Sequence, residues 1–249
     1  MKVVILGAGT AVPASGHSPA GLYVNTGREH LLFDAGPGSA QRLRTIGVSL
    51  WDLDRIFLTH YHLDHCLDLA SILFALRIPQ PTRTRPLTVY GPPGLKRLYR
   101  RLNQAFHGWL APRSHALLLK ELRETTVKLV NASVSSRAMN HSAPALGYRL
   151  EVPRRAIAYS GDTDVCDAIA ELGHNANVLI LECAMTDERR VAGHLTPTAC
   201  GRIADAANCR HLVLTHFYPV FKGYDIRARV RRHFRGHLTL ARDFTTLTV

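Results

Sequence analysis

The chain has few cysteines and no long apolar stretch. Its 249 residues include five cysteines, an odd number without a CxxC pair, which argues against a disulfide framework or a cysteine-based zinc site. No run of about 18 apolar residues occurs, so no membrane-spanning helix is expected. The N-terminal MKVVILGAG lacks a small-residue cleavage site. We interpret it as a first strand and expect a cytoplasmic protein.

Acidic residues are also scarce. The 31 lysines and arginines outnumber 19 aspartates and glutamates, which gives a net charge of +12. Such an excess favours polyanionic partners such as nucleic acid, although an arginine-rich coding bias produces the same balance. The basic residues are densest over 83–101 and 227–235. These two patches are either a surface for an anionic substrate or ordinary solvated faces.

Short apolar runs alternate with segments of helical periodicity. Strand-like runs such as KVVIL, RIFLTH and AIAYSGDT lie close together early in the chain and alternate with helical stretches later. Apolar residues make up 46% of the chain, enough for a sizeable core. No linker, repeat or low-complexity tract divides it. We predict an α/β fold of two mixed sheets flanked by helices, in one domain over residues 1–249.

The segment THYHLDH, residues 59–65, concentrates imidazoles and a carboxylate between a strand-like and a helical run. Because alternate residues of an extended segment point the same way, His60 and His62 can reach one cation. Asp64 and His65 fall into the next turn and suit a second cation a few ångströms away. Imidazole with carboxylate is typical of zinc, with manganese and iron as alternatives.

Further candidate ligands follow other strands of the predicted sheets. Asp162 and His216 each come directly after an apolar run, and strand ends converge at one sheet edge. His141 and His194 lie in loop-like surroundings. For a paired site we predict His60, His62 and His141 on one cation, Asp64, His65 and His216 on the other, and Asp162 as the bridge. The alternatives are that Asp162 is a helix N-cap and that His216 is a core histidine.

The ordered motifs THYHLDH, NHS, SGDT, GHLTP and LTHFYP resemble the metallo-β-lactamase superfamily, and most closely its ribonuclease Z-like branch of zinc phosphodiesterases. The resemblance extends from LGAGTAVP and FDAGPG to LTHFYP, nearly the whole chain. It implies an αββα sandwich of two mixed β-sheets, two Zn²⁺ per chain and a homodimer. The implied substrate is a phosphodiester, either RNA or a cyclic or other small nucleotide, with no membrane partner.

Two features limit what the resemblance implies. Ribonuclease Z carries a long tRNA-gripping arm between the ligands matched here by His141 and Asp162. Only 20 residues separate these two positions, so we expect the arm to be missing and tRNA 3′-processing to be in doubt. The stretch GAGTAV looks like the start of a dinucleotide fingerprint, but Val12 and Pro13 would not open the helix that follows such a motif.

The resemblance also implies a mechanism. A hydroxide shared by two zinc ions would attack phosphorus, with Asp64 as ligand and general base. His194 is the candidate general acid or stabiliser of a phosphate oxygen, and Glu182 is a candidate partner that fixes a ligand imidazole. Alternatively, His194 only precedes a helix whose N-cap is Thr196.

Two other functions remain open from the sequence. The same metal pair can polarise a carbonyl group, as in a lactonase or a β-lactamase-like hydrolase. A non-catalytic, nucleic-acid-binding relative is the third interpretation, although all the expected ligand types are present.

Overall fold

The computed structural model describes residues 1–79, 81–142 and 144–249. Within them the strands form two sheets of seven strands each. The first has the order β14 (Thr246–Thr248), β1 (Lys2–Gly7), β2 (Gly21–Asn25), β3 (His30–Phe33), β4 (Arg55–Phe57), β5 (Leu87–Gly91) and β6 (Leu117–Glu121). The second has the order β13 (His237–Leu240), β12 (His211–Thr215), β11 (Val178–Glu182), β10 (Arg155–Tyr159), β9 (Leu146–Val152), β8 (Ser133–Ala138) and β7 (Thr125–Lys128).

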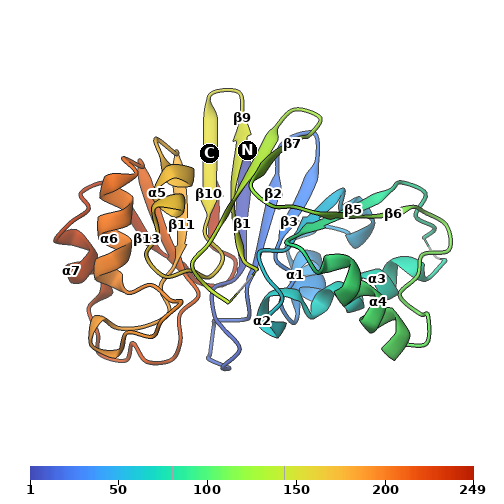
Figure 1. Ribbon diagram of the computed structural model, residues 1–249, viewed down its shortest axis with the longest axis horizontal. Coiled ribbons are helices and arrows are strands. Elements are labelled where there is room, and N and C mark those ends of the chain that lie inside the picture. Colours follow the sequence, from blue (N-terminus) through green and yellow to red (C-terminus); the bar gives the residue numbers. More distant parts are fainter. Residues whose placement is uncertain (80, 143) are drawn as a thin grey trace.

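Helices cover the outer face of each sheet, which confirms the predicted αββα sandwich (Figure 1). One group consists of α1 (Ser39–Thr45), α2 (Leu63–Cys66), α3 (Asp68–Arg77) and α4 (Leu95–Ala105). The other consists of α5 (Asp167–Gly173), α6 (Pro197–Ala206) and α7 (Ile226–Arg231). Short 3₁₀ turns occur at Leu50–Asp52 and Asp187–Arg189. None of the helices in the described ranges has the length and apolar character needed to cross a bilayer.

The core has three parts that follow from this layering. Between the sheets, aromatic rings pack closely, with Phe57 stacked on Phe33 at 5.0 Å and on Tyr90 at 4.6 Å between ring centroids. Two further apolar clusters lie under the two helix groups. The tight packing fixes the two sheets relative to each other, and therefore also fixes the loops at their shared edge.

Each sheet is mixed, and its parallel part determines where the loops gather. Strands β3 to β6 run parallel in the first sheet, and β10 to β13 run parallel in the second. The segments that follow β3, β4, β10, β11 and β12 therefore leave their sheets at carboxyl ends, where sites are commonly built. THYHLDH follows β4, and α2 begins within it.

Several strands of the structure were not predicted from the sequence patterns. The edge strand β6 and the serine-rich β8 are polar or partly exposed, so they lack a clear apolar alternation. The first strand is present as expected, and GAGTAV after it forms no helix. Between β9 and β10 the chain makes a two-residue turn at Pro153 and Arg154, which leaves no room for an inserted arm there.

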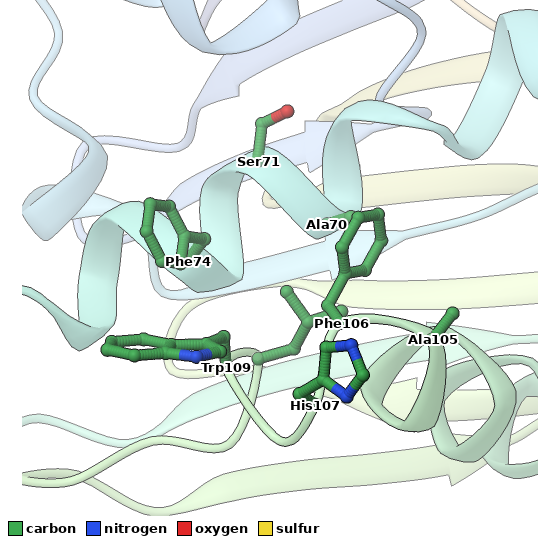
Figure 2. A pocket seen from close by; sticks show the side chains of 8 residues that line it. Ala70, Ser71, Phe74, Ala105, Phe106, His107 and Trp109 are labelled. Atoms are coloured by element: carbon green, nitrogen blue, oxygen red, sulfur yellow. The ribbon is translucent and has the colours of Figure 1, made fainter.

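An apolar groove lies on the outside of the first helix group (Figure 2). It has a volume of about 520 Å³ and is bordered by α3 and by the segment that follows α4.

Candidate metal centre

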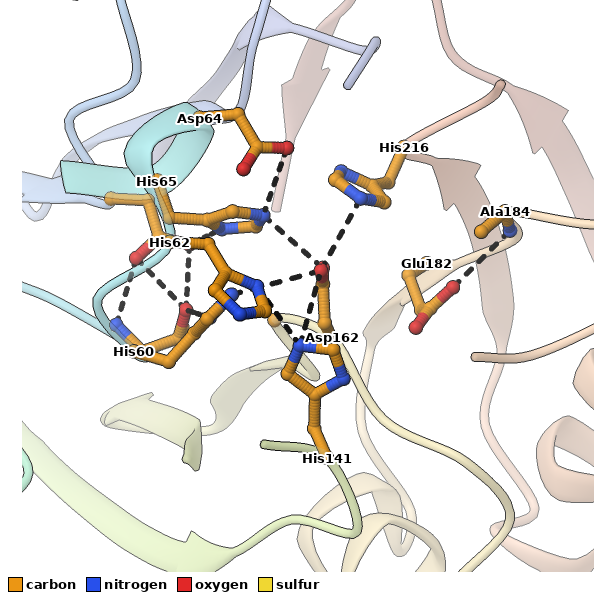
Figure 3. Close-up of polar contacts among 12 residues, drawn as sticks. His60, His62, Asp64, His65, His141, Asp162, Glu182, Ala184 and His216 are labelled. Carbon is orange, nitrogen blue, oxygen red and sulfur yellow. Dashed lines mark hydrogen bonds and ion pairs between the residues drawn. The ribbon is translucent and has the colours of Figure 1, made fainter. Parts of the chain in front are cut away.

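Asp162 lies at the middle of the site, on the loop that follows β10 (Figure 3). Its carboxylate is 3.8 Å from Nε2 of His60 and 3.8 Å from Nε2 of His141. It is also 3.2 Å from Nε2 of His65 and 3.3 Å from Nε2 of His216. One buried carboxylate therefore faces four imidazoles from three different segments of the chain.

The seven predicted ligands fall into two groups of donor atoms around this carboxylate. Within each group the donor atoms lie within 4.8 Å of one another. One group contains His60, His62, His141 and Asp162, and the other contains Asp64, His65 and His216. Asp162 belongs to the first and approaches two members of the second, as a bridging ligand must.

The donor spacing fits a cation. Zinc–nitrogen bonds of about 2.0–2.1 Å at tetrahedral angles put neighbouring donors roughly 3.3–3.4 Å apart. Nε2 of His141 and Nδ1 of His62 are 3.2 Å apart, and the Asp162 contacts span 3.2 to 3.8 Å.

Several of these atoms are buried without a hydrogen-bond partner among the described residues: Nε2 of His60, His65 and His216, and Oδ1 of Asp162. Buried polar atoms are normally satisfied. A set of unpartnered donors directed at one space is the arrangement that a metal ion satisfies.

Local backbone geometry places these groups. Gly161 has a φ of +58°, and a Cβ there would lie 2.6 Å from Cβ of Thr59, so only glycine lets the β10 loop approach β4 so closely. His216 itself has a φ of +61°. A non-glycine residue in this region is strained and is a feature of functional sites.

Asp34, directly after β3, is a positioning residue that the sequence analysis did not assign. Its fully buried carboxylate accepts hydrogen bonds from Nδ1 of His65 at 2.8 Å and from the hydroxyl of Tyr159 at 2.8 Å. It also accepts from the backbone N–H of Thr59 at 2.8 Å and from its hydroxyl. Asp34 thereby fixes the His65 ring with Nε2 toward Asp162. The available signal was an aspartate in FDAGPG at the end of an apolar strand.

Residues that are not predicted ligands also orient other imidazoles of the site. Nδ1 of His60 lies 3.0 Å from the hydroxyl of Thr59, and Nδ1 of His141 lies 2.9 Å from the carbonyl of Gly193. Both rings are therefore held with Nε2 toward Asp162. His62 is the exposed member of its group, at the N-cap of α2.

The electrostatics of the site favour an anionic Asp162 carboxylate. Burial opposes ionisation of Asp162, but His216 and His65 hold the pKa of Asp162 well below its ordinary value. Burial, and then the neighbouring His65, lower the pKa of His60. Burial likewise opposes protonation of His65, but Asp162 and Asp34 outweigh it and hold the pKa of His65 well above its ordinary value. A divalent cation at this site would supply the positive charge that the added proton on His65 supplies here.

Glu182, at the end of β11, is the partner of His194. Its Oε1 accepts a hydrogen bond from Nδ1 of His194 at 2.9 Å, and the backbone N–H groups of Thr163 and Ala184 donate to the same carboxylate. The imidazole that Glu182 fixes is thus His194, rather than one of the seven predicted ligands. Burial opposes protonation of His194, but Glu182 outweighs it and raises the pKa of His194.

The N-caps of α5 and α6 show whether Asp162 and Thr196 act as helix caps. Helix α5 has Cys166 as its N-cap, so Asp162 does not cap it. Helix α6 begins at Pro197 after Thr196, as the sequence indicates, but the Thr196 side chain makes no capping bond. The carboxylate of Asp187 accepts from the N–H of Thr198 instead, at 3.1 Å.

The chain is similar to known proteins over most of its length. The model of the beta-lactamase superfamily domain matches residues 29–217. The ribonuclease Z of Nocardia farcinica is 27% identical over 295 aligned residues, covering 97% of this chain and 95% of that protein. The ribonuclease Z of Salinispora arenicola is 28% identical over 306, covering 100% and 96%. Both alignments are longer than this 249-residue chain, so the relatives contain residues without a counterpart here.

Solved structures show the same fold. YhfI of Bacillus subtilis, a metallo-beta-lactamase fold protein, superposes with a TM-score of 0.86 at 23% identity, covering 99% of this chain and 98% of that one. The short form of human tRNase Z superposes with a TM-score of 0.82 at 24% identity, covering 100% and 99%. Since the family model spans most of the chain, this protein belongs to the beta-lactamase superfamily.

Proposed function

We propose that this protein is a ribonuclease Z-like, dinuclear zinc phosphodiesterase. The observation that carries the proposal is the meeting of two donor groups at the single carboxylate of Asp162. Four imidazole or carboxylate donors on one side and three on the other match the ligand chemistry of zinc better than that of magnesium or calcium, which prefer all-oxygen sites. When bound, such a pair lowers the pKa of water toward ~7 and stabilises charge on a phosphoryl group.

The remaining chemistry comes from side chains of this chain. We assign His194 as the general acid that gives a proton to the leaving oxygen. Its Nδ1 is occupied by Glu182, so Nε2 is the nitrogen left for substrate. Because Glu182 raises the pKa of His194, the ring keeps its proton to a higher pH than a free imidazole does. Asp64 is buried beside His65, with 3.8 Å between Oδ2 and Nε2, and we assign it as a ligand that also orients the attacking water.

The surroundings of His194 suit an anionic substrate. A hollow of about 360 Å³ beside it is bordered by Arg190, Arg202 and Arg229. Two of these are partly neutralised, since Arg190 pairs with Asp164 at 3.0 Å and Arg229 pairs with Glu188 at 2.9 Å. Arg202 is exposed. Guanidinium groups are well matched to phosphate oxygens, which favours a phosphodiester over an uncharged lactone or β-lactam.

The relatives named ribonuclease Z favour RNA as the substrate class. The short turn between β9 and β10 favours an RNA other than one gripped by an inserted arm, or a smaller nucleotide. We also propose that the chain forms a homodimer, as the resemblance implies.

A substrate panel tests the proposal. Zinc-loaded protein is assayed on bis(p-nitrophenyl) phosphate, a cyclic nucleotide, precursor tRNA, a lactone and nitrocefin. We expect turnover of the phosphodiesters and little of the two carbonyl substrates. Preferential turnover of the lactone or of nitrocefin would replace the phosphodiesterase assignment with the carbonyl hydrolase.

A further inference from the structure

One long segment beside the metal centre contains no acidic residue. From Leu69 to Lys120 the sequence has nine lysines and arginines and neither aspartate nor glutamate. Three of these arginines also serve the fold. Arg83 donates to backbone carbonyls near β4 and β5, and Arg85 pairs with Asp54. Arg77 donates to the carbonyls of Gly108 and Ala111.

Helix α4 presents its four cations to solvent: Lys96, Arg97, Arg100 and Arg101 are all exposed. Glu121 caps the N-terminus of α4 by accepting from the N–H groups of Gly94 and Lys96, and its charge offsets the first turn. The second turn, with Arg100 and Arg101, has no ion pair with the described residues. This face of the molecule is therefore strongly positive.

The apolar groove of Figure 2 lies at the far end of α4. Phe106 directly follows the helix, Trp109 lies three residues later, and Phe74 extends from α3 (Figure 2). These three rings are 48%, 48% and 44% exposed. Large aromatic side chains are rarely left this exposed together without a binding role.

Arginines accompany these rings. The guanidinium of Arg77 lies 4.9 Å from the centroid of the Trp109 ring, and that of Arg113 lies 6.0 Å from it. An exposed indole flanked by two guanidinium groups is a surface that favours a flat, electron-rich ligand attached to a negative charge.

The positive face connects this groove to the metal centre. Tyr61, between His60 and His62, donates its hydroxyl hydrogen bond to the carbonyl of Pro92. Its ring also lies against Gly94, the N-cap of α4. From there α4 runs for 11 residues, or about 16 Å at 1.5 Å per residue.

Arg97, Arg101 and Ala105 are four residues apart and so lie along one side of α4. Ala105 borders the groove. The two arginines thus lead from the HYHLDH loop to the aromatic rings.

We propose that this surface, the α4 stripe of Arg97 and Arg101 with the groove of Phe106 and Trp109, binds a single-stranded segment of a nucleic-acid substrate. Bases would stack on Trp109 and Phe106, and phosphates would lie along the arginines, the combination that single-strand-binding proteins use. The proposal rests on the proposed phosphodiesterase function. A second copy of this chain is a poorer occupant, because its own matching face carries the same charge.

The test measures binding and catalysis separately. Fluorescence anisotropy follows a labelled ten-nucleotide 2′-O-methyl RNA, and turnover is measured on bis(p-nitrophenyl) phosphate, which is too small to reach the groove. Trp109→Ala and Phe106→Ala should each weaken RNA binding about tenfold. Trp109→Phe should retain its affinity for the RNA. Arg101→Gln should weaken RNA binding, and the affinity of this variant should depend less on salt concentration than that of the wild type. Arg235→Gln, an exposed arginine of the other basic patch, is the control and should bind nearly as the wild type does.

Thermal melting confirms that each variant is folded, and turnover of the small substrate should stay within about twofold of wild type. Unchanged RNA affinity in Trp109→Ala, Phe106→Ala and Arg101→Gln would overturn the proposal. So would a wild-type dimer that Trp109→Ala dissociates, because the groove would then be a subunit interface. If the wild type binds RNA through these residues but does not hydrolyse bis(p-nitrophenyl) phosphate, the surface stands and the catalytic proposal fails.

Discussion

The carboxylate of Glu182 and the imidazole of His194 are joined by a 2.9 Å hydrogen bond, although they come from a strand end and from a separate loop. Glu182 is fully buried and accepts two backbone N–H groups as well. Burial raises the pKa of the Glu182 carboxyl, while its hydrogen bond with His194 opposes that rise and favours a proton on His194. The carboxylate therefore orients the His194 ring beside the candidate metal centre.

Removing His194 should separate catalysis from metal binding. We expect His194→Ala to keep its zinc content while turnover of bis(p-nitrophenyl) phosphate falls ~10²–10⁴-fold, the usual contribution of a positioned acid. His174→Ala, an exposed histidine on another loop, is the control. Elemental analysis and steady-state kinetics provide the measurements, and wild-type turnover in His194→Ala would show that the ring has no catalytic role.

Changing Glu182 should alter the pH dependence of kcat/KM. Glu182 raises the pKa of His194. The proposed general acid acts in its protonated form, so kcat/KM should fall as pH rises through that pKa. In Glu182→Gln the carboxylate charge is gone, the pKa of His194 drops, and the alkaline limb of kcat/KM moves to lower pH. We expect about tenfold lower kcat/KM near pH 8. A full pH profile checks this, and an unmoved limb would contradict the assignment.

Asp34 should control metal affinity without touching the metal. Asp34→Asn keeps the shape of the side chain and tolerates the φ of +57° at this position, but it loses the charge that orients His65. We expect zinc affinity to fall 10–100-fold, measured by competition with a chelator dye. Equal affinities in wild type and Asp34→Asn would mean that the hydrogen bond to His65 does not tune the site.

Metal removal should destabilise the folded chain. Dialysis against a chelator leaves several unpartnered buried atoms around Asp162, and binding at 100 times the dissociation constant stabilises by about 2.7 kcal/mol. We expect a lower Tm in the apo protein, restoration by Zn²⁺, and two ions per chain by elemental analysis.

In Asp162→Ala the proposed bridging ligand is lost, so metal content and activity should both fall. Retention of two ions per chain in this variant would refute the bridging role.

A histidine pair far from the metal centre should make the fold sensitive to acid. Burial, and then the neighbouring His237, lower the pKa of His211 to about 4; the two rings are 4.0 Å apart between centroids. The pKa of His211 in the folded protein lies below its unfolded value of about 6.5. The contribution of neutral His211 to folding stability is therefore complete above pH 6.5 and is lost as pH falls toward 4.

His211 is half-buried, so solvent screening reduces the effect to roughly 1 kcal/mol. His211→Asn should lose less stability than wild type between pH 6.5 and 4 in urea unfolding experiments. Equal losses in the two proteins would contradict the lowered pKa.

Much of the arrangement was readable from short stretches of sequence. HYHLDH predicted a metal site by itself, because two imidazoles on alternate residues and a carboxylate in the next turn need only local geometry to face one region. The apolar runs before Asp162 and His216 placed both residues at strand ends. Parallel strands share an edge, so their approach to the cluster was predictable once two sheets were expected.

Other features depended on contacts between distant segments. Asp34 gave little signal, because its role requires β3 to lie beside β4 and Tyr159 to reach across from the second sheet. Glu182 was recognised as a buried carboxylate, yet only the packing of β11 against the loop of residue 194 selected His194 as its partner.

The aromatic groove had no sequence signature either. Phe74 and Trp109 are 35 positions apart in the chain, and their rings approach to 6.0 Å only when α3 packs beside the segment after α4. The sequence by itself determined the donor types and the strand ends that carry them, since these follow from local chemistry and periodicity. The tertiary structure decided which side chains meet, because close packing of two sheets brings together groups that no local pattern relates.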